Sequence, residues 1–173
     1  MMRAVWIGIS AICLVVVSCS DDSGESSAAI GGGGGGSGGG ASTIDACALV
    51  TASDATSLFG QPALKETGVT TPDPGLIGQC VWGYDAPDNS SQLLQIQVYN
   101  KDTYYSEPPG ATPFTIGDKG YVAVGGLTGV DIGWIEKGKT VMLSYSTIGP
   151  SVPEASTKVE QVKALAKKVE AAL

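Results

Sequence analysis

The chain has 173 residues, with 10 Lys and Arg, 17 Asp and Glu, no histidine and a formal net charge of −7 at pH 7. Binding to nucleic-acid phosphates needs clustered Lys and Arg, so this balance argues against a nucleic-acid partner. The lack of histidine removes the usual catalytic triads, the imidazole general base and the commonest metal ligand. We therefore expect an acidic protein with no nucleic-acid partner and no histidine-dependent chemistry.

The first 19 residues have the pattern of a bacterial lipoprotein export signal. Arg3 supplies one positive charge, residues 4–17 are predominantly apolar, and the segment ends in V-V-S-C at Cys19. In such a lipobox the cysteine thiol takes a diacylglycerol after export. An uncleaved membrane helix would need about 20 apolar residues, and an ordinary signal peptide would have a small residue in place of Val16. We predict that residues 1–18 are a signal peptide and that Cys19 carries the lipid.

The lipid places the mature protein in the cell envelope, anchored to a bacterial membrane and facing outside the cytoplasm. Two or three palmitate-type acyl chains would make a stable anchor, because each buried methylene contributes about 0.8 kcal/mol. Residues 19–44 would be the lipidated cysteine and a disordered Gly/Ser-rich tether, since the glycine run at 31–36 cannot bury apolar area. A flexible chain of that length spans roughly 25–30 Å. A G-x-S-x-G match at 35–39 lacks the histidine and the strand-to-helix elbow of a hydrolase.

The remaining residues, 45–173, show no repeat and no second low-complexity break, and they predict one globular domain. After signal removal nine lysines face 17 acidic residues, a net charge of about −8 that favours solubility and disfavours anionic lipid surfaces. Cys47 and Cys80 are the two thiols left to meet an oxidising compartment, and we predict a disulfide between them. The alternative is two buried free thiols. A metal site is not expected without histidine or further cysteines.

Local patterns predict a short helix followed by strands. Thr51 and Asp54 have capping-box spacing, and Gly60 suits the left-handed end of a helix. From Gln79 apolar residues alternate with a period of two, and turn residues fill 88–91 and 136–139. The predicted strands cover 79–84, 94–98, 121–124, 130–135 and 140–148.

The last predicted element is a C-terminal helix. Residues 151–154 repeat the capping-box spacing and place Pro153 in the first turn. The helix has an apolar stripe at Ala155, Val159, Val162, Ala166, Val169 and Leu173. We expect this stripe to pack on the sheet, because its alanines are too weakly apolar for a membrane-surface helix. The predicted fold class is α+β: an antiparallel sheet of about five strands covered by a C-terminal helix, with a short N-terminal helix.

One motif resembles a nucleotide site. Residues 133–140 satisfy G-x-x-x-x-G-K-[ST], the phosphate loop of nucleotide hydrolases. That loop requires a helix immediately after it, whereas the residues after Thr140 alternate like a strand. We therefore predict an ordinary hairpin in which Lys139 is exposed, and no nucleotide partner.

Other chemistry is weakly indicated. Two carboxylate pairs, Asp85 with Asp88 and Asp118 with Asp131, could meet in space, but solvated turn residues explain them equally well. The oxygen ligands near Asp88 lack the spacing of a calcium loop. The segment 104–109, with two tyrosines and two prolines, is either an exposed contact patch or a lid on the core, and a lid is favoured. No catalytic residue, cofactor or metal is predicted.

Several short motifs resemble those of the uncharacterised small secreted lipoproteins described mostly from actinobacteria. The matching segments are D-x-C-x-L-V-T at 45–51, L-F-G at 58–60, C-x-W at 80–82, I-G-D-K-G at 116–120 and L-A-K-K-V at 165–169. The resemblance implies a tethered α+β domain without a known catalytic set. We expect a non-catalytic domain that binds an envelope protein, a glycan or a small apolar ligand. The alternatives are a carboxylate-dependent secreted enzyme and a purely structural envelope component.

Overall fold

The computed structural model describes residues 43–67, 73–125 and 129–173. The chain divides into two units, Met1–Gly38 and Gly39–Leu173, and everything reported below belongs to the second. The predicted signal peptide, Cys19 and nearly all of the predicted tether lie outside the described residues. None of the helices within the described ranges has the length and apolar character that a membrane crossing requires.

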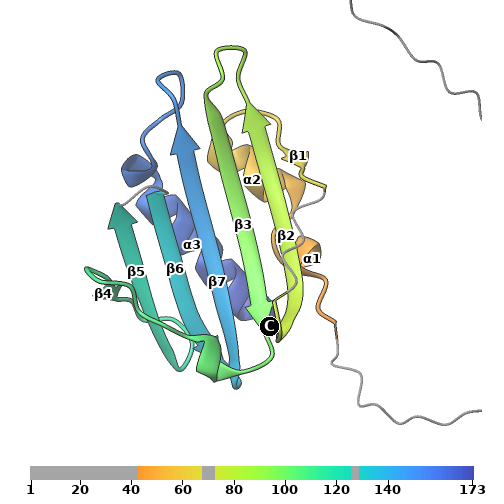
Figure 1. The fold of residues 1–173 in the computed structure, drawn as a ribbon, viewed down its shortest axis with the longest axis vertical. Coiled ribbons are helices and arrows are strands. Elements are labelled where there is room, and N and C mark those ends of the chain that lie inside the picture. The colour runs from red at the N-terminus through yellow and green to blue at the C-terminus, as the bar shows by residue number, and fades with distance from the viewer. Residues whose placement is uncertain (1–42, 68–72, 126–128) are drawn as a thin grey trace, which may run out of the picture. The chain divides into compact units, whose positions relative to one another are not determined.

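Seven antiparallel strands form one sheet in the order β1-β2-β3-β7-β6-β5-β4 (Figure 1). The strands are β1 (Leu64–Lys65), β2 (Leu76–Asp85), β3 (Ser91–Tyr99), β4 (Thr112–Pro113), β5 (Lys119–Gly125), β6 (Gly129–Glu136) and β7 (Lys139–Ile148). The β2–β3 hairpin joins the β5–β6–β7 meander because β7 pairs with β3 along its whole length. The five long strands confirm the predicted strands. The two-residue edge strands β1 and β4 were not predicted.

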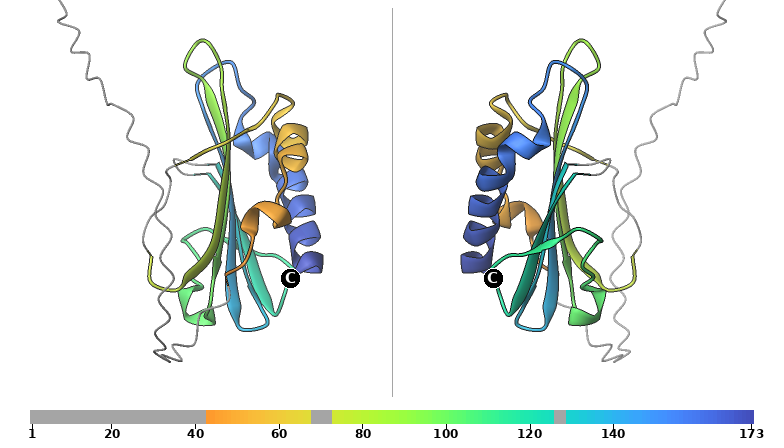
Figure 2. Two further views of the ribbon diagram at one scale, coloured as in Figure 1. Left: turned by 90° about the vertical axis from the view of Figure 1, so that its right-hand side faces the viewer. Right: turned by 90° about the vertical axis from the view of Figure 1, so that its left-hand side faces the viewer.

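The helices all cover one face of this sheet (Figure 2). They are α1 (Ala46–Leu49), α2 (Ala52–Phe59) and α3 (Val159–Ala172), and a 3-10 turn η2 (Ala155–Lys158) leads into α3. The predicted capping box of α2 is confirmed: the Thr51 hydroxyl accepts from the Asp54 N–H, and the Asp54 carboxylate accepts from the Thr51 N–H. Gly60 ends the helix with φ of 71°, as its position suggested.

The core lies between the sheet and the helices. Alternate residues of the central strands face it, and each is almost fully buried: Leu94, Ile96, Val98, Val130, Ile132, Trp134, Val141, Leu143 and Tyr145. From α3 the side chains of Val162, Leu165, Ala166 and Val169 pack against them. The apolar stripe of the last helix therefore packs on the sheet, as predicted, with Leu165 as an additional member.

The predicted start of the last helix is wrong. Residues 151–154 form no capping box, because the Ser151 hydroxyl donates to the Asp88 carboxylate at 2.9 Å and its N–H donates to the Ser90 hydroxyl. Ser151 thus joins the β2–β3 turn instead of capping a helix. The regular helix begins eight residues later, at Val159.

Candidate ligand-binding groove

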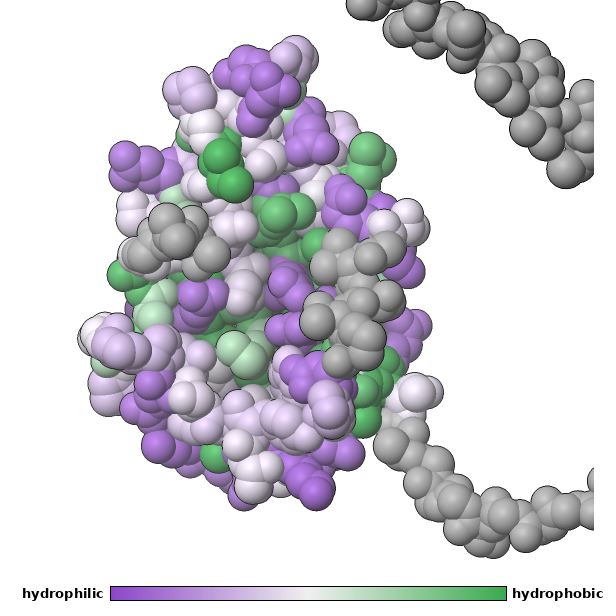
Figure 3. Space-filling view, viewed as in Figure 1, coloured by the Kyte–Doolittle hydropathy of each residue, from purple (hydrophilic) through white to green (hydrophobic). Residues whose placement is uncertain are grey.

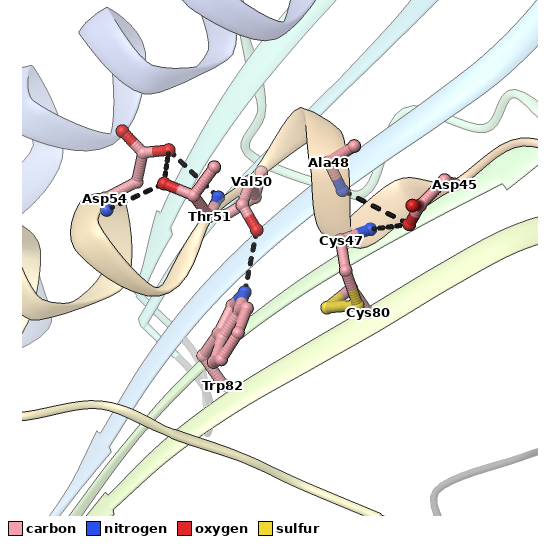
Figure 4. The surroundings of a disulfide bond; sticks show 8 residues. All are labelled: Asp45, Cys47, Ala48, Val50, Thr51, Asp54, Cys80 and Trp82. Carbon is pink, nitrogen blue, oxygen red and sulfur yellow. Dashed lines mark hydrogen bonds between the residues drawn. A yellow bond between two sulfur atoms is a disulfide. The ribbon is translucent and has the colours of Figure 1, made fainter.

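The segment before α2 is fixed to the sheet by a disulfide and an indole (Figure 4). Cys47 and Cys80 form the predicted disulfide, with an S–S distance of 2.09 Å, although Cys47 lies inside the unpredicted helix α1 and not before the first helix. Asp45 caps α1 by accepting from two backbone N–H groups. The Trp82 indole N–H donates to the Val50 carbonyl at 2.8 Å. These contacts, made at Cys47 and at Val50, hold the segment that leads into α2 against strand β2.

A groove of about 380 Å³ opens between α2 and α3, on their outer surface. Its lining residues follow helical spacing on both elements: Asp54, Ser57 and Leu58 from α2, and Gln161, Ala164, Leu165 and Lys168 from α3. Leu58 and Leu165 are buried and form an apolar floor, whereas Ser57, Gln161 and Ala164 are exposed along the rim. The groove is therefore apolar at its base and polar at its mouth.

A charged pair connects the two helices at one point of the groove. The Lys168 ammonium lies 2.7 and 2.6 Å from the two carboxylate oxygens of Asp54. The same carboxylate accepts from the Thr51 hydroxyl at 2.7 Å and from the Thr51 N–H at 2.9 Å. Burial alone would raise the pKa of Asp54, but the hydrogen bonds from Lys168 and Thr51 outweigh it and lower the pKa. The acid is therefore ionised and fully engaged, which makes it a poor proton donor.

Within the described ranges, one connection covers part of the opposite face of the sheet. The connection between β3 and β5 crosses that face and contains the 3-10 turn η1 (Asp102–Tyr104), which lies on the side away from the helices (Figure 2). The Tyr104 ring stacks on Tyr99 with centroids 4.9 Å apart, and the Tyr105 ring meets the edge of Tyr121 at 5.6 Å. Tyr99 and Tyr121 are buried by these contacts. The two tyrosines of segment 104–109 therefore form a lid, but over the open face and not over the main core.

The rest of the open face mixes apolar and polar side chains (Figure 3). Cross-strand register places Leu64, Leu93 and Ile148 on it, with 71%, 37% and 60% of their surfaces exposed. The positions between them and the tyrosines alternate glutamines and serines with Val81 and Met142. This surface is broad and mixed in character, whereas the groove concentrates apolar atoms between two helices.

The predicted carboxylate pairs form no site. Asp88 accepts from the Ser90 N–H and from the Ser151 hydroxyl, so its pKa is lowered by turn hydrogen bonds. Asp131 lies opposite Ala123 on β5, while Asp118 precedes the start of that strand, about 16 Å away at strand spacing. Within the described ranges no group of three or more acidic, cysteine or histidine side chains could hold a metal ion.

The phosphate-loop motif is a hairpin, as predicted. Residues 133–140 run from β6 through a turn at Lys137 and Gly138, whose φ values are positive, directly into β7. The Thr140 hydroxyl, which would hold magnesium in a real phosphate loop, donates to the Lys101 carbonyl at 2.8 Å. Lys139 is half-buried and not exposed as expected.

Sequence reasoning found Asp54 only as a helix cap and did not single out Lys168 or the groove. The helical spacing of Gln161, Leu165 and Lys168 does indicate that these residues share one face of the last helix. Nothing in the sequence shows that α2 lies beside that face. Comparison of the chain with protein-family models, curated protein sequences and solved structures finds no match. The site is therefore interpreted from its own geometry.

Proposed function

We propose that the protein is a membrane-tethered lipoprotein of the bacterial cell envelope whose globular domain binds a ligand without transforming it. The export pattern ending at Cys19 and the resemblance to small secreted lipoproteins support the tether. The Cys47–Cys80 disulfide supports a location outside the cytoplasm, where disulfides persist. The ligand site of this proposal is the groove between α2 and α3.

The observation that carries the proposal is the state of the acid in the groove. A volume of about 380 Å³ lies within the range of small-molecule sites. Carboxylate catalysis would require an acid that can donate a proton or a base that is free to accept one. Asp54 has a lowered pKa and its oxygens already accept from Lys168 and Thr51. The groove therefore has the size of a small-molecule site, but its acid, Asp54, is suited neither to donate a proton nor to accept one.

A fragment screen followed by amide NMR tests this proposal on the unlipidated mature chain. Ligands of the groove should shift the amide signals of Leu58 and Leu165, and Ala164→Phe should abolish those shifts by filling the groove. Ala172→Phe is the matched control, since Ala172 is exposed at the end of α3 outside the groove. A screen in which no compound distinguishes Ala164→Phe from Ala172→Phe would refute binding at this site.

A further inference from the structure

We propose that the ligand of the groove is a small carboxylate with an apolar chain, of the kind represented by a medium-chain fatty acid. The Lys168 ammonium would hold the carboxylate, and the chain would lie on Leu58, Ala164 and Leu165. This inference rests on the proposed function of the groove and adds the chemistry of its ligand.

Lys168 has hydrogen-bonding capacity to spare. Its ammonium has three N–H groups, and its hydrogen-bond acceptors within the described ranges are the two oxygens of one carboxylate, Asp54. The Lys168 side chain is also 54% exposed, so an incoming group can reach it from solvent. A second acceptor can therefore join the ammonium at the mouth of the groove.

Asp54 does not depend on Lys168 alone. Its carboxylate keeps two hydrogen bonds from Thr51, at 2.7 and 2.9 Å, whichever way the lysine turns. Ion pairs with a solvent-accessible partner contribute little to stability, and Lys168 is such a partner, so turning it toward a ligand costs little. Lys168 can therefore exchange Asp54 for a ligand carboxylate while Thr51 and Asp54 keep the capping box of α2 intact.

The remaining lining suits an alkyl chain. Leu58 and Leu165 present apolar atoms at the base, and Ala164 adds a methyl group without blocking the space between the helices. The Ser57 hydroxyl already donates to the Ser53 carbonyl at 2.8 Å. From Lys168 to Gln161 the groove follows α3 for two turns, about 10 Å, which matches an extended octanoate chain.

The charge of the domain makes Lys168 decisive for an anion. With about eight more acidic than basic groups after signal removal, the surface repels anions in general. A carboxylate therefore gains from this domain only where a lysine meets it directly. The same alkyl chain with a neutral hydroxyl head would lose that charge-assisted hydrogen bond.

The test titrates octanoate, octanol and octylammonium, each below its micelle concentration, into the unlipidated mature chain and follows amide NMR shifts. Octanoate should shift the signals of Leu58, Leu165 and Lys168 and bind about tenfold more tightly than octanol, since a charged hydrogen bond is worth about that factor. Lys168→Gln should remove this tenfold preference, and Lys168→Arg should retain most of it. Lys167→Gln is the matched control, because Lys167 is also exposed and paired, with Glu170 at 2.9 Å.

The outcomes separate the two proposals. Equal affinity for octanoate and octanol, or a preference unchanged by Lys168→Gln, would overturn the carboxylate assignment and leave the groove as a binding site. Tighter binding of octylammonium would do the same. If none of the three probes, nor any screened fragment, produces shifts that Ala164→Phe removes, both the ligand class and the groove itself are refuted. Melting temperatures of the variants check that each remains folded.

Discussion

Gln92 is the amide side chain that the sequence pattern did not anticipate in the core. It lies on the same side of β3 as Leu94 and Ile96 and is only 1% exposed. Its carbonyl oxygen accepts from the Tyr145 hydroxyl at 2.6 Å, and its amide donates to the Phe59 carbonyl at 3.3 Å. Burial raises the pKa of Tyr145 to about 12, so the tyrosine remains a neutral donor at physiological pH. One glutamine thus connects β3, β7 and the end of α2.

Gln92→Ala should lower the free energy of unfolding by about 2–4 kcal/mol, because it orphans the Tyr145 hydroxyl and leaves a cavity. Tyr145→Phe should lower the free energy of unfolding by about 1–2 kcal/mol, since it leaves the Gln92 amide oxygen without its donor. Urea unfolding of the double variant Gln92→Ala/Tyr145→Phe should show a smaller loss than the sum of the two single losses. Strict additivity would mean that the two residues do not depend on each other.

Asp54→Asn should destabilise the protein by about 1 kcal/mol at neutral pH, through loss of the ionised helix cap. Because the folded pKa of Asp54 is lowered, its contribution is complete above the unfolded value near 3.9 and is lost as pH falls through the folded value. The difference between wild type and variant should therefore shrink in acid. Lys168→Gln, which leaves the capping box in place, should cost no more than about 0.5–1 kcal/mol at neutral pH. A difference that grows on acidification would contradict this assignment.

At the scale of elements, sequence patterns predicted the long strands and the helix that begins with capping residues. The five long strands and α2 were found from alternation and from Thr51 with Asp54. Helix α1, with four residues, and the edge strands β1 and β4, with two each, are too short to show a period. The start of the last helix was misplaced because Ser151 makes its hydrogen bonds to a turn more than 60 residues away. The groove depends on Asp54 meeting Lys168, a contact 114 residues apart in the chain.

Reduction of the Cys47–Cys80 disulfide should lower stability by about 2–4 kcal/mol, because the bond closes a loop of 33 residues in the unfolded chain. The part of the chain that it holds, α1 and α2, should lose amide protection before α3 does. Hydrogen exchange with and without reductant measures this, and the double variant Cys47→Ala/Cys80→Ala separates the effect of the bond from that of the reductant. Equal protection of α1 and α2 in both states would show that the bond is not what holds them.

Lys139→Ala in the β6–β7 hairpin should lower stability by no more than about 1 kcal/mol, because Lys139 is half-buried at the end of the strand pairing and outside the main core. Lys139 lies opposite Glu136 at the end of the pairing, and the chain continues from it as a strand and not as the helix that a phosphate loop needs. Millimolar ATP with magnesium should leave the melting temperature of the wild-type protein unchanged. A rise that disappears in Lys139→Ala would mean that the hairpin binds nucleotide after all.

At the scale of the whole molecule, the proposed lipid anchor on Cys19 has the largest consequence for where the domain would work. Cys19→Ser should abolish incorporation of labelled palmitate and release the protein from the membrane fraction of a bacterial host, because no thiol remains at the lipobox. Mass spectrometry of the N-terminal peptide measures the lipid directly. Cys47→Ser serves as the control, since it alters a cysteine of the disulfide and not the lipobox. An unmodified Cys19 in the exported wild-type protein would refute the anchor.

The two-residue edge strands β1 and β4 have a consequence for aggregation when many copies of the protein are crowded together. The proposed lipid anchor would confine copies to a plane, where neighbours collide far more often than in free solution. Long unpaired strand edges in such a layer would act as templates for cross-β fibrils. Here Leu64–Lys65 places a lysine along one rim, and Thr112–Pro113 places a residue without an N–H along the other. These two short strands therefore cover part of the outer edges of β2 and β5 and interrupt the pairing that a neighbouring sheet would need.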